Sequence, residues 1–353
     1  MSYYISLFCN KLLNDKVFKS KQNEIYLDIH INMNKFVFVI IIAIVFCDER
    51  QTFKQFQKFM QRYEKKYDSV QEYLARYQIF KRNIEEMSKV SNDELFKNGI
   101  NQFTDMTKNE FRRKYLNLNI SIKNTLKTNN KLKYTPKLNT PDNFDWNDKG
   151  AVTPVKNQGS CGSCWAFCTV ANLEGLYFIK HKELLRFSEQ QLVDCDTFDQ
   201  GCNGGLMENS FEWIKQNGGL CLEDDYQYKG YEGTCNNSVN KVVKVIDWTL
   251  LDSMDEEVIK DYLYNTGPLA VALNADTLQY YSSGILSSDS YDCDPAGMNH
   301  GVSITGYGVE NGIKYWKVKN SWGTSWGENG YFRILRGKGT CGINTYISSA
   351  TIA

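Results

Sequence analysis

The stretch NQGSCGSCWAF, residues Asn157–Phe167, places Cys161 and Cys164 three residues apart, between glycines and beside a tryptophan. A Cys-x-x-Cys pair can form half of a zinc site, a redox dithiol, or a nucleophile next to a structural cysteine. Each of these uses needs different partners elsewhere in the chain. The other cysteines and the histidines therefore decide between them.

The chain offers few partners for a metal. Its three histidines, His30, His181 and His300, are far apart, and there is no second Cys-x-x-Cys pair. A zinc site needs two further ligands at close spacing, so zinc is not expected. A redox dithiol would follow a strand in a small βαβ unit, and no strand pattern leads into this stretch.

A thiol nucleophile remains, and it requires a base. His30 lies upstream of an export signal, and His181 lies in a polar stretch between lysines. His300, in MNHGVSITGYG, is therefore the expected base for Cys164.

Charge and cysteines are unevenly distributed along the 353 residues. Residues 1–139 hold 25 basic and 14 acidic residues, whereas residues 140–353 hold 16 and 27. Opposite net charges suggest two parts that bind each other rather than nucleic acid. Nine of the eleven cysteines lie in residues 161–341, which is typical of an oxidising compartment.

An export signal is visible near the amino terminus. The apolar run Phe36–Cys47 has the length of a signal-peptide core and is too short for an ordinary membrane span. Met33 lies where such a signal would begin, so residues 1–32 are expected to be an artefact of start-codon choice. Cleavage is expected near Cys47. An internal signal anchor that keeps the protein on a membrane is the alternative.

Local patterns predict the elements that follow. Residues 50–115 are predicted to be helical, because apolar residues recur at steps of four and three. The polar stretch Asn117–Asn139 is predicted to be an exposed linker that proteases can cut. A helix is expected over Trp165–Lys180, and strands over Val242–Ile246, Ile313–Lys319 and Tyr331–Leu335.

The chain resembles the papain-type cysteine proteases of the cathepsin L and cathepsin F kind. The similarity rests on the CGSCW motif at residues 161–165, on His300, and on Asn320, which opens NSWGTSWGENGYF. It implies an α+β, papain-like fold with two domains: a helical left half at about residues 150–248 and a β-barrel right half at about 249–340. Residues 1–47, 48–139 and 140–353 would be the amino-terminal extension with its signal peptide, an inhibitory propeptide and the peptidase domain.

The resemblance also implies the roles of single residues. Cys164 would be a nucleophile at a helix N-terminus, His300 its ion-pair partner and the proton donor to the leaving amine, and Asn320 the group that orients the imidazole. Gln158 would help to hold the oxyanion. The substrate-binding residues would be Gly205, Leu206, Met207, Ala272, Met298, Trp322 and Tyr346. No metal or other cofactor is implied.

Three disulfides are implied by the resemblance: Cys161–Cys202, Cys195–Cys235 and Cys293–Cys341. Cys168 and Cys221 are then left over. In an oxidising compartment we expect a fourth disulfide between them. The alternative is two buried thiols that pack as small apolar side chains.

The amino-terminal part resembles the inhibitory prosegment of the same family. The positions that match its motifs are Glu72, Arg76, Phe80, Asn83, Gly99, Asn101, Phe103 and Asp105, whereas Met87 and Ser91 depart from them. The mature chain is expected to begin near Thr140. The sequons at Asn119 and Asn236 are candidate glycosylation sites.

These features predict a cysteine endopeptidase that is made as a secreted zymogen and prefers an apolar residue in the second acyl-side pocket. It would act in a lysosome-like acidic vesicle or outside the cell. The expected partners are protein and peptide substrates, the protein's own propeptide as an intramolecular inhibitor, and cystatin-like inhibitors. A monomer is expected, without nucleic acid or stable membrane insertion. An inactive relative that acts as a binding protein and a membrane-anchored protein are the alternatives.

Activity should depend on both members of the expected catalytic pair. Cys164→Ala should abolish peptide hydrolysis and leave an unprocessed zymogen, because no other thiol replaces the nucleophile. His300→Ala should remove most of the rate, since neither other histidine is suitably placed. Turnover of a peptide substrate by the purified variants is the measurement, and near-native turnover by either would contradict the assignment.

Overall fold

The computed structural model describes residues 49–90, 95–118, 134–137, 139–252, 255–287 and 293–353. The chain divides into two compact units, residues 1–82 and 83–353. The predicted export signal, Met33, His30 and the Asn119 sequon lie outside the described residues. None of the helices in the described ranges is long and apolar enough to cross a membrane.

The described residues form both helices and strands. The helices are α3 (Val70–Val90), α4 (Lys108–Tyr115), α5 (Cys164–His181), α6 (Glu189–Cys195), α7 (Met207–Gln216) and α8 (Glu256–Thr266), with short 3-10 turns η2 (Gly201–Asn203), η3 (Asp276–Tyr280) and η4 (Thr340–Gly342). The strands are β1 (Phe96–Asn98), β2 (Phe144–Asp145), β3 (Val245–Asp252), β4 (Leu269–Leu273), β5 (Tyr281–Leu286), β6 (His300–Glu310), β7 (Ile313–Lys319), β8 (Tyr331–Leu335) and β9 (Tyr346–Ile352).

In the first unit, aromatic side chains hold helical residues 49–62 against the first turns of α3. The Phe56 ring lies 5.3 Å from the Phe80 ring and 5.4 Å from the Tyr77 ring, and Phe56 and Phe80 are fully buried. On the surface of α3, Arg76 lies 3.9 Å from Glu72 one turn before it. The period of four and three thus marks a real helix face here.

The predicted helical character of residues 50–115 is wrong for residues 63–69 and 95–107. Residues Phe96–Asn98 form strand β1, which pairs with β5 in antiparallel register, and the Gly99 N–H donates to the Tyr280 carbonyl at 2.8 Å. These hydrogen bonds come from partners in a distant part of the sequence. A local pattern therefore carries no information about them.

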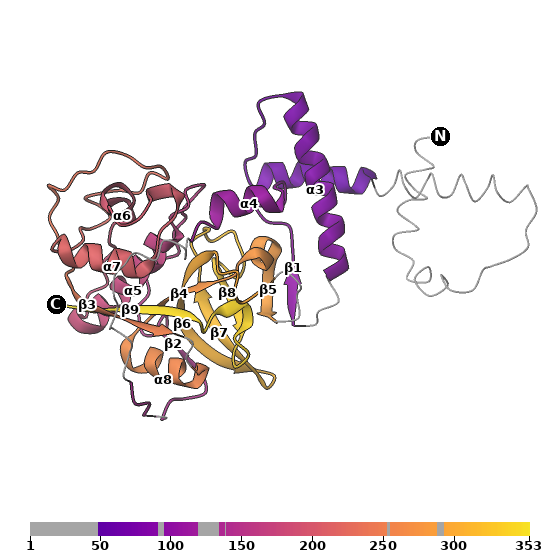
Figure 1. Ribbon diagram of the computed structural model, residues 1–353. Coiled ribbons are helices and arrows are strands. Elements are labelled where there is room, and N and C mark those ends of the chain that lie inside the picture. Colours follow the sequence, from indigo (N-terminus) through magenta and orange to yellow (C-terminus); the bar gives the residue numbers. More distant parts are fainter. Residues whose placement is uncertain (1–48, 91–94, 119–133, 138, 253–254, 288–292) are drawn as a thin grey trace, which may run out of the picture. The chain divides into compact units, whose positions relative to one another are not determined.

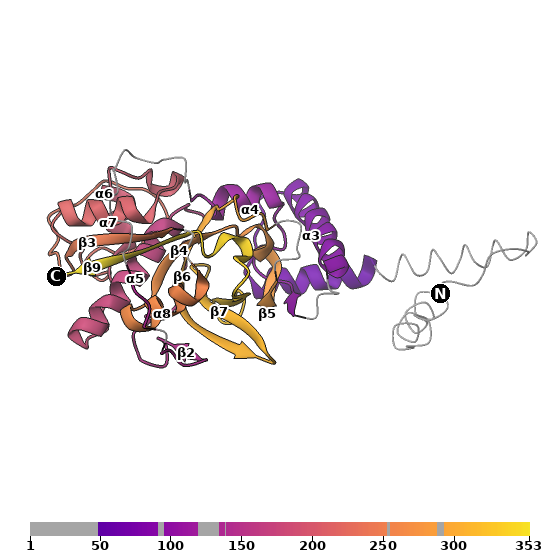
Figure 2. The same ribbon diagram turned by 60° about the horizontal axis from the view of Figure 1, so that its bottom comes forward.

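The second unit is built on a mixed sheet with helices at one end. The strand order is β1-β5-β8-β7-β6-β4-β9-β3, and β2 pairs with β6. Helices α5, α6 and α7 gather at one end of this unit, and β5, β7 and β8 at the other (Figure 1 and Figure 2). Strand β9 joins the sheet although it lies beyond residue 340, the expected end of the strand-rich half.

The sequence predicted several elements of this unit closely. Strands β7 and β8 have the predicted bounds, and α5 extends one residue beyond the predicted helix at each end. Strand β3 begins only at Val245, three residues later than predicted, because Val243 forms an isolated bridge with Leu220 instead. The α+β fold class is confirmed.

The structure contains the three disulfides that the resemblance implies, Cys161–Cys202, Cys195–Cys235 and Cys293–Cys341. The predicted fourth disulfide is wrong, because Cys168 and Cys221 are separate buried thiols. The Cys168 Sγ donates to the carbonyl of Trp165 in its own helix, at 3.3 Å. The Cys221 carbonyl accepts from the Ser188 N–H at 3.1 Å, and its thiol also contacts Ser188. The two thiols therefore have different neighbours.

The described ends of the predicted linker are exposed only in part: Thr135, Lys137 and Asn139 are exposed, as predicted, but other residues are not. Leu118 is only 6% exposed, and the Tyr134 hydroxyl and the Lys137 N–H both donate to the Asp261 carboxylate on α8. The polar composition predicted exposure along the whole stretch. Burial of Leu118 and the bonds of Tyr134 and Lys137 to Asp261 depend on residues outside it. The residues between Leu118 and Tyr134 lie outside the described part of the chain.

Strand β1 provides a test of how the expected propeptide is held. A Cβ on Gly284 would overlap the Leu95 carbonyl oxygen and lie 2.7 Å from the Phe96 Cα. Gly284→Ala should therefore loosen β1 and make release of residues 48–139 several-fold faster in acid. The half-time of cleavage near residue 139, followed on a gel, is the measurement.

Gly312→Ala is the matched control. Gly312 also has a positive φ, +81° against +93° at Gly284, so both changes cost about 1 kcal/mol of backbone strain. Nothing lies within 4 Å of a Cβ on Gly312. Equal cleavage half-times for the two variants would show that the β1 contact has no part in holding the segment.

Candidate active site

Cys164 is the first residue of α5 and is fully buried. Strand β6 approaches this helix end closely, since a Cβ on Gly301 would lie 3.2 Å from the Cys164 carbonyl oxygen and 2.8 Å from the Cys168 Sγ. Only glycine permits this approach without displacement of the helix. The residue before Gly301 is His300, so the helix start and the strand start bring the expected nucleophile and base together.

The imidazole of His300 is held on two sides. Its Nε2 lies 2.8 Å from the Asn320 Oδ1, and its ring stacks on Trp322 at 4.7 Å and 27° between planes. The antiparallel pairing of β6 with β7 explains the contact with Asn320. Ser303 pairs with Lys319, the last residue of β7, so the next residue, Asn320, lies beside the start of β6 at His300. The bond to Asn320 leaves Nδ1 as the nitrogen available for other partners.

Gln158 is fully buried and held in a fixed orientation. Its Nε2 donates to the Cys161 carbonyl at 3.0 Å, and its Oε1 accepts from the Ser321 hydroxyl at 2.6 Å. The Tyr228 hydroxyl donates to the Gln158 carbonyl at 2.7 Å. Ser321 and Tyr228 are not predicted from the sequence as site residues, although Ser321 directly follows Asn320.

Burial keeps the nucleophile and the base uncharged in this form of the protein. Burial raises the pKa of the Cys164 thiol to about 11, against the opposing effect of backbone N–H groups of Gly301, Trp165 and Asn117. Burial likewise lowers the pKa of His300 to about 4, although Asn320 and the Tyr115 carbonyl oppose it. Nδ1 of His300 has no hydrogen bond of normal geometry within the described residues. Burial therefore opposes the expected ion pair of Cys164 with His300.

The covering segment is Tyr115–Leu118. The Gln158 Nε2 lies 3.4 Å from the Tyr115 carbonyl oxygen, so a peptide carbonyl lies next to the expected oxyanion donor. The Leu118 N–H donates to the Asn299 carbonyl at 3.0 Å, and Leu118 forms a parallel bridge with Gly205. Nothing in the sequence analysis identified this segment, because its contacts come from distant residues.

The residues expected to bind substrate fall into two groups. Leu206, Met207, Ala272 and Tyr346 belong to one buried apolar cluster, with Met298 packed against it. Leu118 belongs to the same cluster, and it forms a bridge with Gly205, the residue before Leu206. Trp322 belongs instead to the second cluster, beside His300. Pairing of Ala272 with Tyr346 across β4 and β9 brings these two together from distant positions in the sequence.

The second propeptide motif forms a compact turn against the peptidase domain. The Asn101 Nδ2 donates to the Gln279 carbonyl at 2.8 Å, and the Phe103 N–H donates back to the Asn101 Oδ1. The Asn83 Nδ2 donates to the Thr104 carbonyl at 2.8 Å, and Asp105 is buried nearby.

Aromatic packing anchors this turn on Trp322. The Phe103 ring lies 5.3 Å from the Trp322 ring, and the Phe111 ring lies 5.2 Å from it, both edge to face. The Gln102 Nε2 donates to the Trp322 carbonyl at 2.7 Å. The Trp322 side chain that stacks on His300 is therefore also the surface on which the propeptide turn and α4 pack.

An ion pair adds to the docking. The Arg112 guanidinium, on α4, binds the Asp276 carboxylate through two bonds of 2.7 Å. The Asn299 Nδ2 also donates to Asp276, at 3.1 Å. This contact joins the basic amino-terminal part to the acidic carboxyl-terminal part, as their net charges suggested.

A buried charge network lies behind the site. The Lys156 Nζ lies 3.0 Å from Glu174, 2.8 Å from Glu189 and 3.1 Å from Glu223. Burial raises the pKa of Glu189 to about 7, and burial lowers the pKa of Lys319 to about 8. Lys319 directly precedes Asn320, so this network supports the backbone that carries the imidazole's partner.

Comparison with known proteins identifies the class of this site. Residues 140–351 match the family described as "Papain family cysteine protease", and residues 56–111 match "Cathepsin propeptide inhibitor domain". Cysteine proteinase 15A of Pisum sativum is 41% identical over 84% of this chain and 86% of that protein. Cysteine proteinase 1 of Dictyostelium discoideum is 40% identical, over 90% and 98%.

Solved structures agree with this. Digestive procathepsin L2 proteinase from Tenebrio molitor larval midgut superposes with a TM-score of 0.78 at 35% identity, over 85% of this chain and 99% of that one. The site is thus that of a thiol-dependent peptide hydrolase covered by its own prosegment. The chain belongs to the papain family of cysteine proteases and is made with an inhibitory propeptide.

The raised pKa of Cys164 predicts how the thiol reacts. In the unprocessed chain, alkylation of Cys164 by iodoacetamide should be slow at pH 7 and should rise only as pH approaches 10 to 11, because the thiolate is the nucleophile. After processing, alkylation should be fast at pH 7, since the thiol becomes solvated. Peptide mass mapping separates Cys164 from Cys168 and Cys221. Equal rates at pH 7 for the two forms would contradict this.

Proposed function

We propose that the chain is the zymogen of an endopeptidase that cleaves peptide bonds with Cys164 as nucleophile and His300 as acid and base. The observation that carries this is the geometry around His300, with Nε2 bound to Asn320, the ring shielded by Trp322 and the neighbouring Gly301 packed on the N-terminus of α5. An inactive binding protein would not need an imidazole oriented in this way.

Removal of the propeptide would start the chemistry. Once solvent reaches the site, the thiol can transfer its proton to Nδ1 of His300, and the positive end of α5 favours the thiolate. The Cys164 sulfur then attacks the substrate carbonyl carbon, and the carbonyl oxygen becomes negative. Gln158 Nε2 and the Cys164 N–H would stabilise that oxygen. The nearby Tyr115 carbonyl supports this role for Gln158.

Two further proton transfers complete the cycle. His300 gives its proton to the leaving amine as the carbon–nitrogen bond breaks, which leaves a thioester on Cys164. A water molecule then attacks the thioester carbon and gives its proton to His300. The carbon–sulfur bond breaks, the peptide acid leaves, and the thiolate with protonated His300 is restored.

The side chain of Leu118 supports the proposed specificity. It belongs to the same buried apolar cluster as Leu206, Met207, Ala272 and Tyr346, the residues of the proposed second acyl-side pocket. An aliphatic side chain buried there would contribute about 1.5–3 kcal/mol. Tyr346 shortens the pocket, which favours leucine or valine over phenylalanine.

An endopeptidase fits the residues better than an exopeptidase. Papain-type carboxydipeptidases carry a further histidine on a loop that closes one end of the cleft. In residues 140–353 of this chain, the only histidine besides His300 is His181. His181 stacks on Tyr177 at 4.3 Å, at the far end of α5. The aminopeptidase relative keeps a cysteine-containing prosegment peptide, and residues 48–160 contain no cysteine.

Export and acidic activation complete the proposal. The signal-like run Phe36–Cys47 and the three disulfides support a secretory route to a lysosome-like vesicle or the exterior. Activation in mild acid follows if the acidic carboxyl-terminal part loses negative charge and binds the basic amino-terminal part less tightly. We further propose a monomeric mature enzyme that cystatin-like inhibitors can block.

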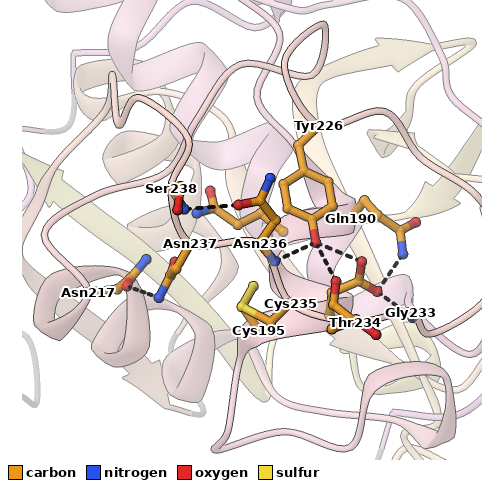
Figure 3. The surroundings of a disulfide bond; sticks show 12 residues. Gln190, Cys195, Asn217, Tyr226, Gly233, Thr234, Cys235, Asn236, Asn237 and Ser238 are labelled. Carbon is orange, nitrogen blue, oxygen red and sulfur yellow. Dashed lines mark hydrogen bonds between the residues drawn. A yellow bond between two sulfur atoms is a disulfide. The ribbon is translucent and has the colours of Figure 1, made fainter.

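The surroundings of the Cys195–Cys235 disulfide support glycosylation of Asn236 (Figure 3). Asn236 is exposed directly after the disulfide, and its Oδ1 accepts from the Ser238 N–H at 3.1 Å. The Tyr226 hydroxyl accepts from the Asn236 N–H at 3.1 Å and fixes the start of this turn. An exposed Asn-x-Ser turn in an exported protein is a suitable acceptor for an N-linked glycan.

A substrate scan tests the proposed function. The processed enzyme should react with an epoxide thiol-protease probe at Cys164, and it should cleave dipeptide substrates with leucine or valine at the second acyl-side position faster than those with phenylalanine or arginine. No acidic side chain belongs to the proposed pocket residues, so arginine lacks a partner there. Higher kcat/KM for arginine than for leucine would contradict the specificity, and absence of both labelling and cleavage would favour a binding protein.

A further inference from the structure

Two buried carboxyl groups, joined by a side-chain hydrogen bond, lie next to the backbone that binds the propeptide. Asp196 and Asp199 lie between α6 and η2 and are 6% and 9% exposed. Carboxylates are seldom buried without a cation, because burial penalises the charged form. The contacts of this carboxyl pair, Asp196 and Asp199, show how the cost is avoided.

Asp199 has the contacts of an ionised carboxylate. Its Oδ1 accepts from the Leu206 N–H at 2.9 Å and from the Asn209 Nδ2 at 3.0 Å. Its Oδ2 accepts from the Ser210 hydroxyl at 3.4 Å. Leu206 is the residue before α7, so the negative charge also lies at the positive end of a helix.

Asp196 has the contacts of a protonated carboxyl group. Its Oδ1 accepts from the Phe198 N–H at 2.8 Å, but its Oδ2 is buried and receives no donor from the described residues. A proton on Asp196, donated to Asp199, removes the repulsion and gives Oδ2 a partner. Burial, followed by the charge of Asp199, raises the pKa of Asp196 to about 9, and burial raises the pKa of Asp199 to about 6.

Neighbouring charges do not replace this proton. The nearby lysine, Lys229, pairs instead with Asp194 on α6, at 3.9 Å. The Glu232 carboxylate packs against Gly201 on η2, and Glu208 lies in the first turn of α7. In the described ranges, no lysine or arginine forms an ion pair with either member of the carboxyl pair.

The carboxyl pair contacts the backbone that binds the propeptide. A Cβ on Gly205 would lie 2.6 Å from the Asp199 Cγ and 2.6 Å from the Trp165 ring. Gly205 also forms the parallel bridge with Leu118. We call the backbone of Gly205 and Leu206, which pairs with Leu118, the edge Gly205–Leu206. Asp199 fixes its position through a contact with Gly205 and a hydrogen bond from the Leu206 N–H.

We propose that Asp196 and Asp199 share one proton and act as positioning residues, which hold the edge Gly205–Leu206 in place for the substrate backbone. This rests on the proposed function, since it takes the edge that holds Leu118 as the edge that binds substrate. When the shared proton is lost, two adjacent negative charges repel each other, Asp199 moves from Leu206, and peptide binding weakens.

The sign of the pH effect follows from the shared proton. The folded chain binds this proton, and the unfolded chain, with an ordinary Asp pKa of about 4, releases it at neutral pH. The stability contributed by the carboxyl pair is therefore greatest below pH 4 and declines as pH rises towards about 9. A protein with this pair is suited to an acidic compartment.

The test uses the mature Cys164→Ala protein, processed in trans, so that the catalytic ion pair does not contribute. The Kd of a fluorescent peptide with leucine at the second acyl-side position is measured by anisotropy from pH 6 to 9.5. We expect Kd to rise about tenfold above pH 8, the change that corresponds to one pKa unit of coupling. A Kd that stays constant would overturn the proposal.

Asp196→Asn in the same background replaces the shared proton with a permanent amide donor to Asp199. Its Kd should remain constant to pH 9.5, whereas the control Asp224→Asn, which removes an exposed carboxylate of the same domain, should keep the tenfold rise. An Asp196→Asn protein that keeps the rise would overturn the proposal. Thermal unfolding against pH checks that each variant folds, and the Tm of Asp196→Asn should lose part of its decline with rising pH.

Carboxyl ¹³C NMR of aspartate-labelled protein measures the proton directly. The resonance that disappears in Asp196→Asn should belong to a protonated group at pH 7 and should titrate near pH 9. An ionised Asp196 at pH 7 would overturn the inference even if Kd varied with pH. Failure of any peptide to bind at any pH would overturn the assignment of the edge and with it the proposed function.

Discussion

The close approach of α5 to β6 at Gly301 is the constraint on which the site depends. A Cβ at this position would lie 2.8 Å from the Cys168 Sγ and 3.2 Å from the Cys164 carbonyl oxygen, so the Cys168 side chain and the helix end would both have to shift. Because glycine removes that obstacle, the first residue of a helix and the first residue of a strand meet. The helix contributes its positive end and the thiol, and the strand contributes the imidazole and, through β7, its partner Asn320.

The propeptide inhibits by electrostatics as well as by obstruction. Segment Tyr115–Leu118 excludes water from the site, and burial then holds Cys164 and His300 in their neutral forms. The same Trp322 that protects the His300–Asn320 bond receives Phe103 and Phe111. The propeptide therefore packs on the same tryptophan ring that stacks on His300.

Buried ionisable groups connect the active site to pH. Glu189 in the Lys156 network and Asp196 in the carboxyl pair both have raised pKa values, with burial as the main cause. Both therefore bind protons in the folded state that the unfolded chain would release at neutral pH, so both favour the folded state in acid. Glu189 binds Lys156, and Asp199, the partner of Asp196, contacts Gly205 and Leu206.

The sequence by itself determined the family, the fold class, helix α5 and strands β7 and β8, since motifs and apolar periods are local properties. It also identified Cys164, His300, Asn320 and Gln158 as the candidate site. Only the tertiary structure decided that residues 96–98 form a strand, that Leu118 is buried in the site, and that Cys168 and Cys221 are separate thiols. Each of these depends on partners that are distant in the sequence, and the distance in space between such residues is set by packing, which a local pattern does not record.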